Sequence, residues 1–427
     1  MPNQLARPIA IIGSLRIPFA RSHTAYRNCS NQQMMSKVLA SLVERFALTG
    51  ERLGDVSLGA VIKHSKDWNL ARESTLSSGL APETPAFDVQ RACGTSLSAA
   101  VLVGTKISTG LIEAGIAGGT DSISDVPMVY PEAYRKILME SARGRSLVQK
   151  IKPWLALRPR HFKPEFPDVI EPRTKLSMGE SMELTAREWQ LSRVDQDAFA
   201  LESHRRAAQA QAEGFYDDLL IEYQGLRKDN NVRPDSSMEK LAKLRPVFDG
   251  SEHGTMTAGN STPLTDGASA MLLASEEWAR ERGLPVLAYL THSRVTAVDF
   301  VNQEGLLMAP AYAVSEMLND ASLSLANFDF YEIHEAFAAQ TLATLKAWES
   351  ESFCSSRLGR NMPLGEIDRR KLNSKGGSVA IGHPFAATGT RILGSLAKLL
   401  HQKGSGRGLV SVCTAGGMGV TAILEAS

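Results

Sequence analysis

Short apolar runs alternate with longer segments of helical periodicity in the first part of the chain. Ile9 to Gly13 is an uninterrupted apolar run that ends in glycine, which predicts a buried strand. Asn31 to Phe46 follows with apolar residues at helical spacing, which predicts a helix. Three more strands are predicted at 56–63, 87–90 and 112–119, and a helix of small residues at 92–111. Strands that alternate with helices indicate an α/β fold with a mixed or parallel sheet.

The alternation breaks between about 125 and 246, where prolines interrupt the pattern repeatedly. Residues 134–163 hold nine Lys or Arg against one acidic residue, Glu140. An apolar patch, Trp154 to Leu157, lies within this basic stretch, and residues 181–212 resemble a helix with charged faces. We therefore predict an insertion made mainly of helices and loops.

Alternation resumes after Pro285. The apolar pattern predicts strands at 286–291, 328–333, 409–413 and 420–424, and helices at 311–319, 335–348 and 386–400. The order repeats that of the first part, because Cys93 and His383 each precede a helix of small residues, followed by a strand and paired glycines. We therefore predict two similar halves, 1–285 with an insertion at about 125–246, and 286–427.

Composition narrows the class of protein. Of the 427 residues, 43% are hydrophobic and 22% are charged, as in ordinary globular proteins. The net charge of +1 gives no overall attraction to nucleic acid, so we expect no nucleic-acid partner. The four cysteines are too scattered for a disulfide framework, which favours a reducing compartment. Because the sequence shows neither a secretory signal nor an apolar run of about 18 residues, we predict a cytoplasmic location.

Cys93 is the first candidate for chemistry. It lies in Gln90-Arg91-Ala92-Cys93-Gly94-Thr95-Ser96, at the predicted junction of a strand and a helix. The N–H groups and the dipole at a helix start favour an anion, so we expect a lowered thiol pKa and a nucleophile. Gly94 would allow a substrate to approach the backbone closely. The alternative is an inert packed cysteine, which is the commoner fate of a free thiol.

His383 is the candidate base. It lies in Gly376-Gly377-Ser378-Val379-Ala380-Ile381-Gly382-His383-Pro384, where the glycines suit close approach to a ligand or to another segment. A neutral imidazole at this position could take the thiol proton and form a Cys–His pair. A packed core histidine is the alternative.

Three further segments carry polar or reactive side chains. Cys413, before a glycine turn, could move a proton to or from a carbanion, or it could belong to the core. His334 could donate to an oxyanion, and Glu335 could orient a water or a ring; the alternative for the acid is that it complements a helix dipole. The polar loop 258–268 could line a channel for a long polar ligand, or form turns without a ligand.

Two kinds of site are not indicated. The histidines and cysteines match no metal-binding spacing such as HExxH or a CxxC pair, so no metal is expected. No Walker or GxGxxG loop is visible, which argues against nucleotide-phosphate chemistry.

Taken together and in this order, the segments resemble the thiolase family along the full chain. Five segments carry the resemblance: those around Cys93, 258–268, 334–338, His383 and Cys413. The form His334-Glu335-Ala336-Phe337-Ala338 and the basic insertion resemble the branch of the trifunctional-enzyme β subunit and related bacterial 3-ketoacyl-CoA thiolases. The resemblance implies the thiolase fold, in which two βαβαβαββ halves form a five-layer αβαβα core.

The resemblance also implies a role for each matching residue. Cys93 would attack the 3-keto carbonyl and become acylated, and His383 would activate it and help hold the thioester oxygen. Cys413 would protonate the leaving acetyl-CoA enolate and then deprotonate incoming CoA. His334 would stand where the family's Asn positions a water for a first oxyanion hole, and the backbone N–H groups of Cys93 and Ala415 would form a second.

Contacts with CoA are implied for four residues: Ser177, Met178, Ser261 and Thr262. Ser177 stands where several thiolases have a histidine. CoA would be a substrate, so no cofactor is implied.

The implied activity is thiolytic cleavage of 3-ketoacyl-CoA in fatty-acid β-oxidation. A short-chain acetoacetyl-CoA thiolase is the alternative, since the motifs do not distinguish chain lengths. A decarboxylating ketosynthase is a third hypothesis. Cys413 argues against it, because those enzymes lack the second catalytic cysteine. The family further implies a homodimer or a dimer of dimers. A hydratase–dehydrogenase α subunit or a membrane surface could bind residues 134–163, which could instead be a solvated face over the CoA channel.

Overall fold

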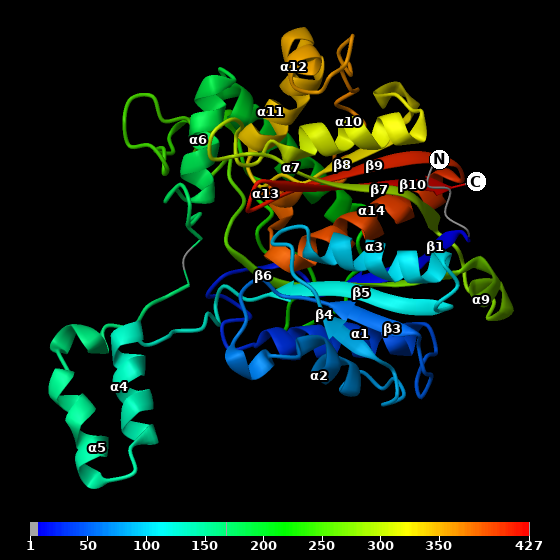
Figure 1. Ribbon diagram of the computed structural model, residues 1–427. Helices are drawn as coiled ribbons and strands as arrows, with labels where there is room; N and C mark the ends of the chain where they lie inside the picture. The colour runs from blue at the N-terminus through cyan, green and yellow to red at the C-terminus, as the bar shows by residue number, and fades with distance from the viewer. Residues whose placement is uncertain (1–6, 168, 427) are drawn as a thin grey trace.

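The computed structural model describes residues 7–167 and 169–426. Its first half follows the predicted alternation, and a strand after the insertion completes it (Figure 1). The elements of this half are β1 (Ile9–Arg16), β2 (Ala20–Arg21), α1 (Asn31–Arg45), β3 (Asp55–Leu58), α2 (Leu70–Leu76), β4 (Ala86–Asp88), α3 (Thr95–Ser108), β5 (Ala114–Asp121), β6 (Thr265–Ser275) and α9 (Glu276–Glu281). Helix α1 begins with a capping box in which Ser30 and Gln33 satisfy each other's backbone N–H groups.

The second half repeats the order of the core strands and helices, with differences in the smaller elements. Its elements are β7 (Ala288–Ala297), α10 (Ala309–Ala321), β8 (Phe330–Ile333), α11 (Ala338–Glu349), α12 (Glu351–Ser356), α13 (Ser378–Ile381), α14 (Thr388–Lys403), β9 (Gly406–Thr414) and β10 (Met418–Ala426). Where the first half has β4, the described part of this half has an isolated parallel bridge between Tyr331 and Leu372.

The strand order makes the repeat visible in space. The path runs β4-β3-β5-β6-β1 through the first half and continues β7-β10-β9-β8 through the second. Corresponding strands therefore lie at equal distances from the junction, where β1 pairs with β7 at Ala10–Tyr289 and Ile11–Ala288. The outer pairs of each half are parallel and the inner pairs are antiparallel, as expected for a mixed sheet.

Five layers follow from this order (Figure 1). Helices α10 and α11 cover the outer face of the second-half strands, and α1 and α2 cover the outer face of the first-half strands. Helices α3 and α14 pack against each other between the two sets of strands. The αβαβα arrangement that the resemblance implied is confirmed.

Several sequence-based boundaries were wrong. The strand expected over 56–63 ends at Leu58, because the N–H groups of Val61 and Ile62 turn to the Asp121 carboxylate. The helix expected over 181–212 is two helices, α6 (Met178–Glu188) and α7 (Arg193–Ala212), which are separated by Gln190 with φ of 51°.

Two further corrections concern segments next to the candidate site. Residues 265–268, which the sequence placed in a polar loop, begin strand β6, and all of β6 is buried because it pairs with β5 and β1. The helix expected from Glu335 begins at Ala338, which leaves 334–337 in a loop.

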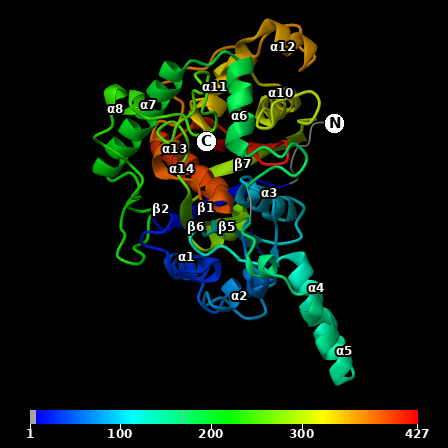
Figure 2. The ribbon, with the colours of Figure 1, turned by 90° about the vertical axis from the view of Figure 1, so that its left-hand side faces the viewer.

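The insertion divides into two parts. One part is an arm, residues 132–162, with α4 (Glu132–Arg143), α5 (Leu147–Ile151) and two 3₁₀ turns; it stands away from the rest of the molecule (Figures 1 and 2). The Tyr134 ring contacts the rings of Trp154 and Phe162 within this arm. The other part packs on the body, where α6 contacts α11, and α7 contacts α13 and α8 (Met238–Ala242). No described helix is both long and apolar enough to cross a bilayer.

Candidate active site

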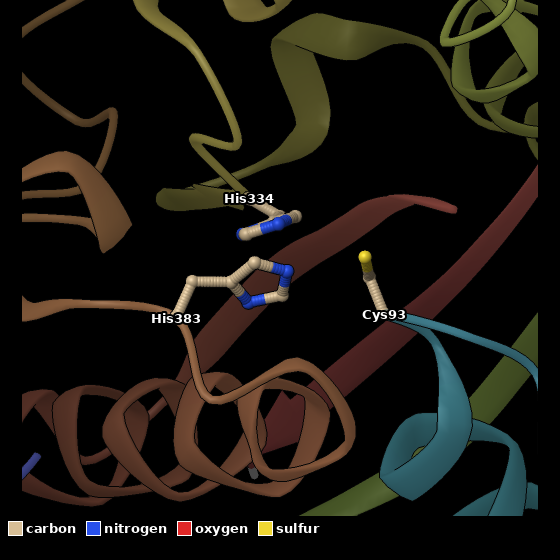
Figure 3. A group of neighbouring side chains, drawn as sticks. All are labelled: Cys93, His334 and His383. Carbon is tan, nitrogen blue, oxygen red and sulfur yellow. The ribbon is translucent and has the colours of Figure 1, made fainter. Parts of the chain in front are cut away.

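Three side chains that the sequence singled out meet in space. The Cys93 sulfur and one ring nitrogen each of His334 and His383 lie within 4.8 Å of one another (Figure 3). Cys93 comes from the turn before α3, His334 from the loop after β8, and His383 from the turn before α14. The site therefore draws its thiol from one half of the repeat and both imidazoles from the other.

The turn that presents Cys93 is strained and tightly bonded. Ala92 has φ of 42°, which a residue with a side chain rarely adopts. Thr95 holds this turn, since its hydroxyl accepts from the Arg91 N–H at 2.8 Å and donates to the Ala92 carbonyl at 2.7 Å. A Cβ on Gly94 would lie 2.9 Å from Thr414 and 2.8 Å from Val420. Gly94 thus allows close approach of β9 and β10, and the approach of a substrate to its backbone stays a prediction.

The resting Cys93 thiol is not acidic. Burial raises its pKa to about 12, while the N–H groups of Ala415 and of Cys93 itself act in the opposite direction. The expectation of a lowered pKa from the helix start was therefore wrong for the free site, because removal from water outweighs the backbone donors. Those two N–H groups face the sulfur and lie where the resemblance expects an oxyanion hole.

His383 is a buried neutral imidazole. Burial, and secondarily the positive charge of Arg391, lower its pKa to about 3. Its Nδ1 lies 2.5 Å from the Thr388 hydroxyl, and its backbone N–H donates to Thr265 at 3.2 Å. Gly382, with φ of 109°, makes the bend that brings His383 into place; a Cβ there would lie 2.7 Å from Asn231.

His334 lies beside His383, with ring centroids 4.1 Å apart. Burial, and then the charges of His383 and Arg391, lower its pKa well below the usual value. Its Nδ1 lies 2.9 Å from the Ser378 hydroxyl. The Nε2 atoms of His334 and His383 are both buried and have no hydrogen-bond partner among the residues that the structure describes. Two unpartnered ring nitrogens beside a thiol could serve two purposes: one could accept the thiol proton, and the other could donate to a substrate oxygen.

Cys413 completes the set of reactive groups. It is buried at the end of β9, paired across the hairpin with Gly419. Burial raises its pKa well above the usual value, and the nearby Cys93 acts in the same direction. The two thiols are thus close enough that a charge on one opposes a charge on the other.

Comparison with known proteins agrees with this arrangement. Models of the N-terminal and C-terminal domains of thiolase match residues 9–277 and 284–426. The 3-ketoacyl-CoA thiolase of Yersinia pestis (strain Pestoides F) is 41% identical over 423 residues, which cover 98% of this chain and 96% of the relative. The chain belongs to the thiolase family.

Solved thiolase structures have the same fold. The acetyl-CoA acetyltransferase of Bacillus anthracis superimposes with a TM-score of 0.82 at 30% identity and covers 100% of both chains. Human mitochondrial 3-ketoacyl-CoA thiolase in complex with CoA superimposes with a TM-score of 0.82 at 27% identity and covers 99% of both chains.

The residues for which this thiolase sequence implied CoA contacts have structural partners of their own. Ser177 caps α6, since its hydroxyl accepts from the Glu180 N–H at 3.2 Å and its N–H donates to the Glu180 carboxylate at 2.7 Å. Met178 packs partly buried against the second-half core. The Thr262 hydroxyl donates to the Ser378 carbonyl at 2.9 Å, whereas the buried Ser261 hydroxyl has no partner among the described residues. Contact of all four with CoA stays a prediction.

Sequence reasoning missed Arg391 and the function of Ser378 behind the His334 imidazole of this thiolase, and it singled out Glu335 without its buried partners. Arg391, which is 3% exposed, donates to the Ser378 hydroxyl at 2.8 Å. Glu335 is buried and accepts from Ser203 at 2.7 Å, from Asn373 at 2.6 Å and from the Val379 N–H at 3.1 Å. These contacts fix the segment that carries Ser378. The only available signal was the position of Ser378 within the glycine-rich segment before His383.

The sulfur and two ring nitrogens could also be considered as ligands for a metal ion. The positive charge of Arg391, whose guanidinium donates to the Ser378 hydroxyl beside His334, opposes a cation placed among these groups. We therefore interpret the cluster as a nucleophile with two imidazoles.

Proposed function

We propose that this chain is a 3-ketoacyl-CoA thiolase (acetyl-CoA C-acyltransferase), which uses CoA to cleave a 3-ketoacyl-CoA into acetyl-CoA and a shortened acyl-CoA. The observation that carries the proposal is the meeting of the Cys93 sulfur with His334 and His383, with the Cys413 thiol nearby. The name of the 41% identical relative supports the same activity. CoA takes part as a substrate, and the chemistry requires no resident cofactor.

In the first half-reaction, the Cys93 sulfur bonds to the 3-keto carbon while its proton passes to Nε2 of His383. With a thiol pKa of about 12 and an imidazole pKa of about 3, the resting pair is neutral, so the proton moves as the sulfur attacks. The bond between C2 and C3 then breaks. It leaves an acyl group on Cys93 and an acetyl-CoA enolate, which Cys413 protonates at C2.

In the second half-reaction, the Cys413 thiolate takes the proton of an incoming CoA thiol. The CoA sulfur attacks the acyl–Cys93 thioester and releases the shortened acyl-CoA. Cys93 then regains its proton from His383, which restores every group to its resting state.

Two oxygens gain negative charge during these steps, and the site offers donors for both. The N–H groups of Cys93 and Ala415, which face the sulfur, suit the oxygen on C3. His383, once protonated, and His334 suit the thioester oxygen of the enolate. Because the site is buried, each such donor is worth more than it would be in water.

The test is CoA-dependent cleavage of acetoacetyl-CoA and 3-ketohexadecanoyl-CoA by the full chain, followed as loss of the 3-ketoacyl thioester. Faster cleavage of the long substrate would support a function in fatty-acid β-oxidation. Activity confined to acetoacetyl-CoA would support the alternative, a short-chain acetyl-CoA C-acetyltransferase, which the 30% identical acetyltransferase structure favours. No cleavage of either substrate by the folded protein would overturn the proposal.

We propose a second function for the arm at 132–162, contact with a membrane surface. Residues 134–163 hold nine Lys or Arg and one acid. Leu147, Val148 and Leu155 are exposed at 78%, 75% and 76%. Apolar side chains among cationic ones suit the interface of an anionic bilayer, and the arm's position away from the body favours this over a cover for the CoA channel.

Flotation with vesicles tests the arm. The full chain is expected to float with anionic vesicles and not with neutral ones, and a variant lacking 134–163 is expected to stay in solution. Equal flotation of both proteins would overturn membrane contact. Binding of a hydratase–dehydrogenase subunit that requires the arm, without flotation, would assign the arm to that partner.

The proposal also covers the oligomeric state and the cellular location. We propose a homodimer or a dimer of dimers in the cytoplasm, with the two halves of each chain dividing near residue 285. Sedimentation of the purified protein tests the assembly.

A further inference from the structure

One hydroxyl connects an imidazole of the site to a permanent cation. The Ser378 oxygen lies 2.9 Å from Nδ1 of His334 and 2.8 Å from Nη2 of Arg391. Ser378 and His334 are each 0% exposed and Arg391 is 3% exposed, so water does not supply other partners. Arg391 lies 4.0 Å from Glu332, whose pKa is raised to about 8 by burial.

The direction of these hydrogen bonds follows from counting protons. A guanidinium can only donate, so Arg391 donates to the Ser378 oxygen. Ser378 has one hydrogen, and His334 Nδ1 is the acceptor that the described structure offers it. If Nδ1 instead carried the imidazole proton, both neighbours would donate to Ser378 and its own buried hydrogen would lack an acceptor. Leaving such a buried group unpaired is costly, and the tautomer with its proton on Nε2 avoids that cost.

We propose that Arg391 and Ser378 are positioning residues that hold His334 as the tautomer with its proton on Nε2. This inference rests on the proposed thiolase function. The Nε2–H then points into the site as a direct donor to the enolate oxygen of the departing acetyl-CoA. It replaces the water that the family's Asn would position, because Nε2 of His334 is buried and otherwise unpartnered.

Comparison with His383 shows what Arg391 and Ser378 add at His334. Its Nδ1 contacts the hydroxyl of Thr388, for which the described structure shows no second, donating partner. That hydroxyl is free to accept from Nδ1–H of His383, so Nδ1 can keep its proton while Nε2 gains and loses one, as a base requires. Arg391 prevents the same freedom at Ser378, and the two neighbouring imidazoles are thereby given different functions.

The experiment is a double-mutant cycle with Ser378→Ala and His334→Asn. An amide has a fixed NH₂ donor and needs no tautomer selection. Removing one oxyanion donor typically lowers kcat by about 100-fold or more, and loss of its tautomer bias is expected to cost about tenfold to 100-fold. Ser378→Ala is therefore expected to lower kcat by that amount when His334 is present, with KM little changed, and by less than about threefold when it is combined with His334→Asn.

Ser411→Ala is the matched control. Ser411 is 1% exposed and its hydroxyl lacks a partner among the described residues, so its removal is expected to leave kcat unchanged. Equal losses from Ser378→Ala in both backgrounds would overturn the proposal, because Ser378 would then act through the fold in general. If Ser378→Ala does not fold, Arg391→Met replaces it in the same cycle.

The tautomer itself provides a second readout. In protein with ¹⁵N-labelled histidine, the His334 signals are expected to show a protonated Nε2 in the wild type and a mixture of tautomers in Ser378→Ala. A protonated Nδ1 in the wild type would overturn the proposal even if the enzyme were active. Absence of CoA-dependent cleavage in the wild type would instead overturn the thiolase function, so the two failures are distinguishable.

Discussion

The arm exposes apolar side chains to solvent, whereas the site around Cys93 buries ionisable side chains. In the arm, Leu147 and Leu155 are exposed at 78% and 76% amid lysines and arginines. In the site, His334 and His383 are exposed at 0% and 3%, and burial shifts the pKa of each. Each placement opposes folding or solubility, so each indicates a ligand: a small polar substrate group in the site, and a large surface at the arm.

The difference predicts that the two proposed functions are separable. The arm's main packing contacts are internal, through the rings of Tyr134, Trp154 and Phe162. The site depends on segments that are far apart in sequence and bonded to one another in the core. Changes in the core should therefore alter turnover, while changes in the arm should alter only where the protein binds.

The largest expected effect is that of Cys93→Ala. Loss of the nucleophile removes the acyl-enzyme route, and turnover should fall by about 10⁴-fold or more. The measurement is the steady-state rate of thiolysis at saturating CoA. Cys354→Ala is the control, since Cys354 is a buried thiol whose sulfur, among the described residues, donates only to the carbonyls of Ala347 and Trp348. Comparable inactivation of both would show that the loss came from the fold.

Cys413→Ala should have the next largest effect. Without its proton, the enolate leaves slowly, and general-acid loss typically lowers turnover by about 10²–10⁴-fold. Labelled acyl groups transferred from shortened acyl-CoA to Cys93 should still appear in the quenched protein. A variant that turns over at the wild-type rate would remove Cys413 from the mechanism.

Gly94→Ala should weaken the core without deleting a reactive group. The added methyl meets Thr414 and Val420 at 2.9 and 2.8 Å. Such overpacking typically lowers the free energy of unfolding by about 1–3 kcal/mol, and it would displace Cys93 from the imidazoles. Denaturant unfolding and kcat together measure both effects; an unchanged midpoint would show that the strands move apart at no cost.

Deleting the arm should change turnover least. Acetoacetyl-CoA cleavage is expected to stay within about threefold of wild type, because the arm's main packing contacts are internal. Flotation with anionic vesicles should be lost. A large fall in kcat together with normal vesicle binding of the shortened protein would contradict this prediction. It would show that the arm contributes to catalysis and not to membrane contact.

The sequence revealed the reactive residues better than the residues that control them. Cys93, His334 and His383 each follow or precede a recognisable strand or glycine turn, so their segments could be found from local pattern. Ser378 and Arg391 could not, since their function comes from packing against a loop more than 40 residues earlier in the chain. The acidity of Cys93 was misjudged because a helix start is visible in sequence and burial is not.

Other errors have similar physical causes. Strand β6 is built largely from Gly, Ala and Ser before its aliphatic residues, so it lacks the β-branched run that marks a strand. The basic and apolar composition of the arm was visible in the sequence. Its position away from the body was not, because that position follows from tertiary contacts, which the sequence does not show. The boundary at Ala338 was missed because Glu335 and Ala336 are good helix formers, while the backbone of 334–337 bonds instead to 261–262 and 411.

The junction of β1 and β7 has a consequence for how the chain could be divided. Two residue pairs link the strands of the halves, while Cys93 lies on one side of the link and the proposed base and acid, His383 and Cys413, lie on the other. Either half alone would be chemically silent, holding a thiol without its proton acceptor or an acceptor without its thiol. Two fragments cut between β6 and β7 would thus form a complementation pair in which restored turnover reports that the interface has assembled correctly.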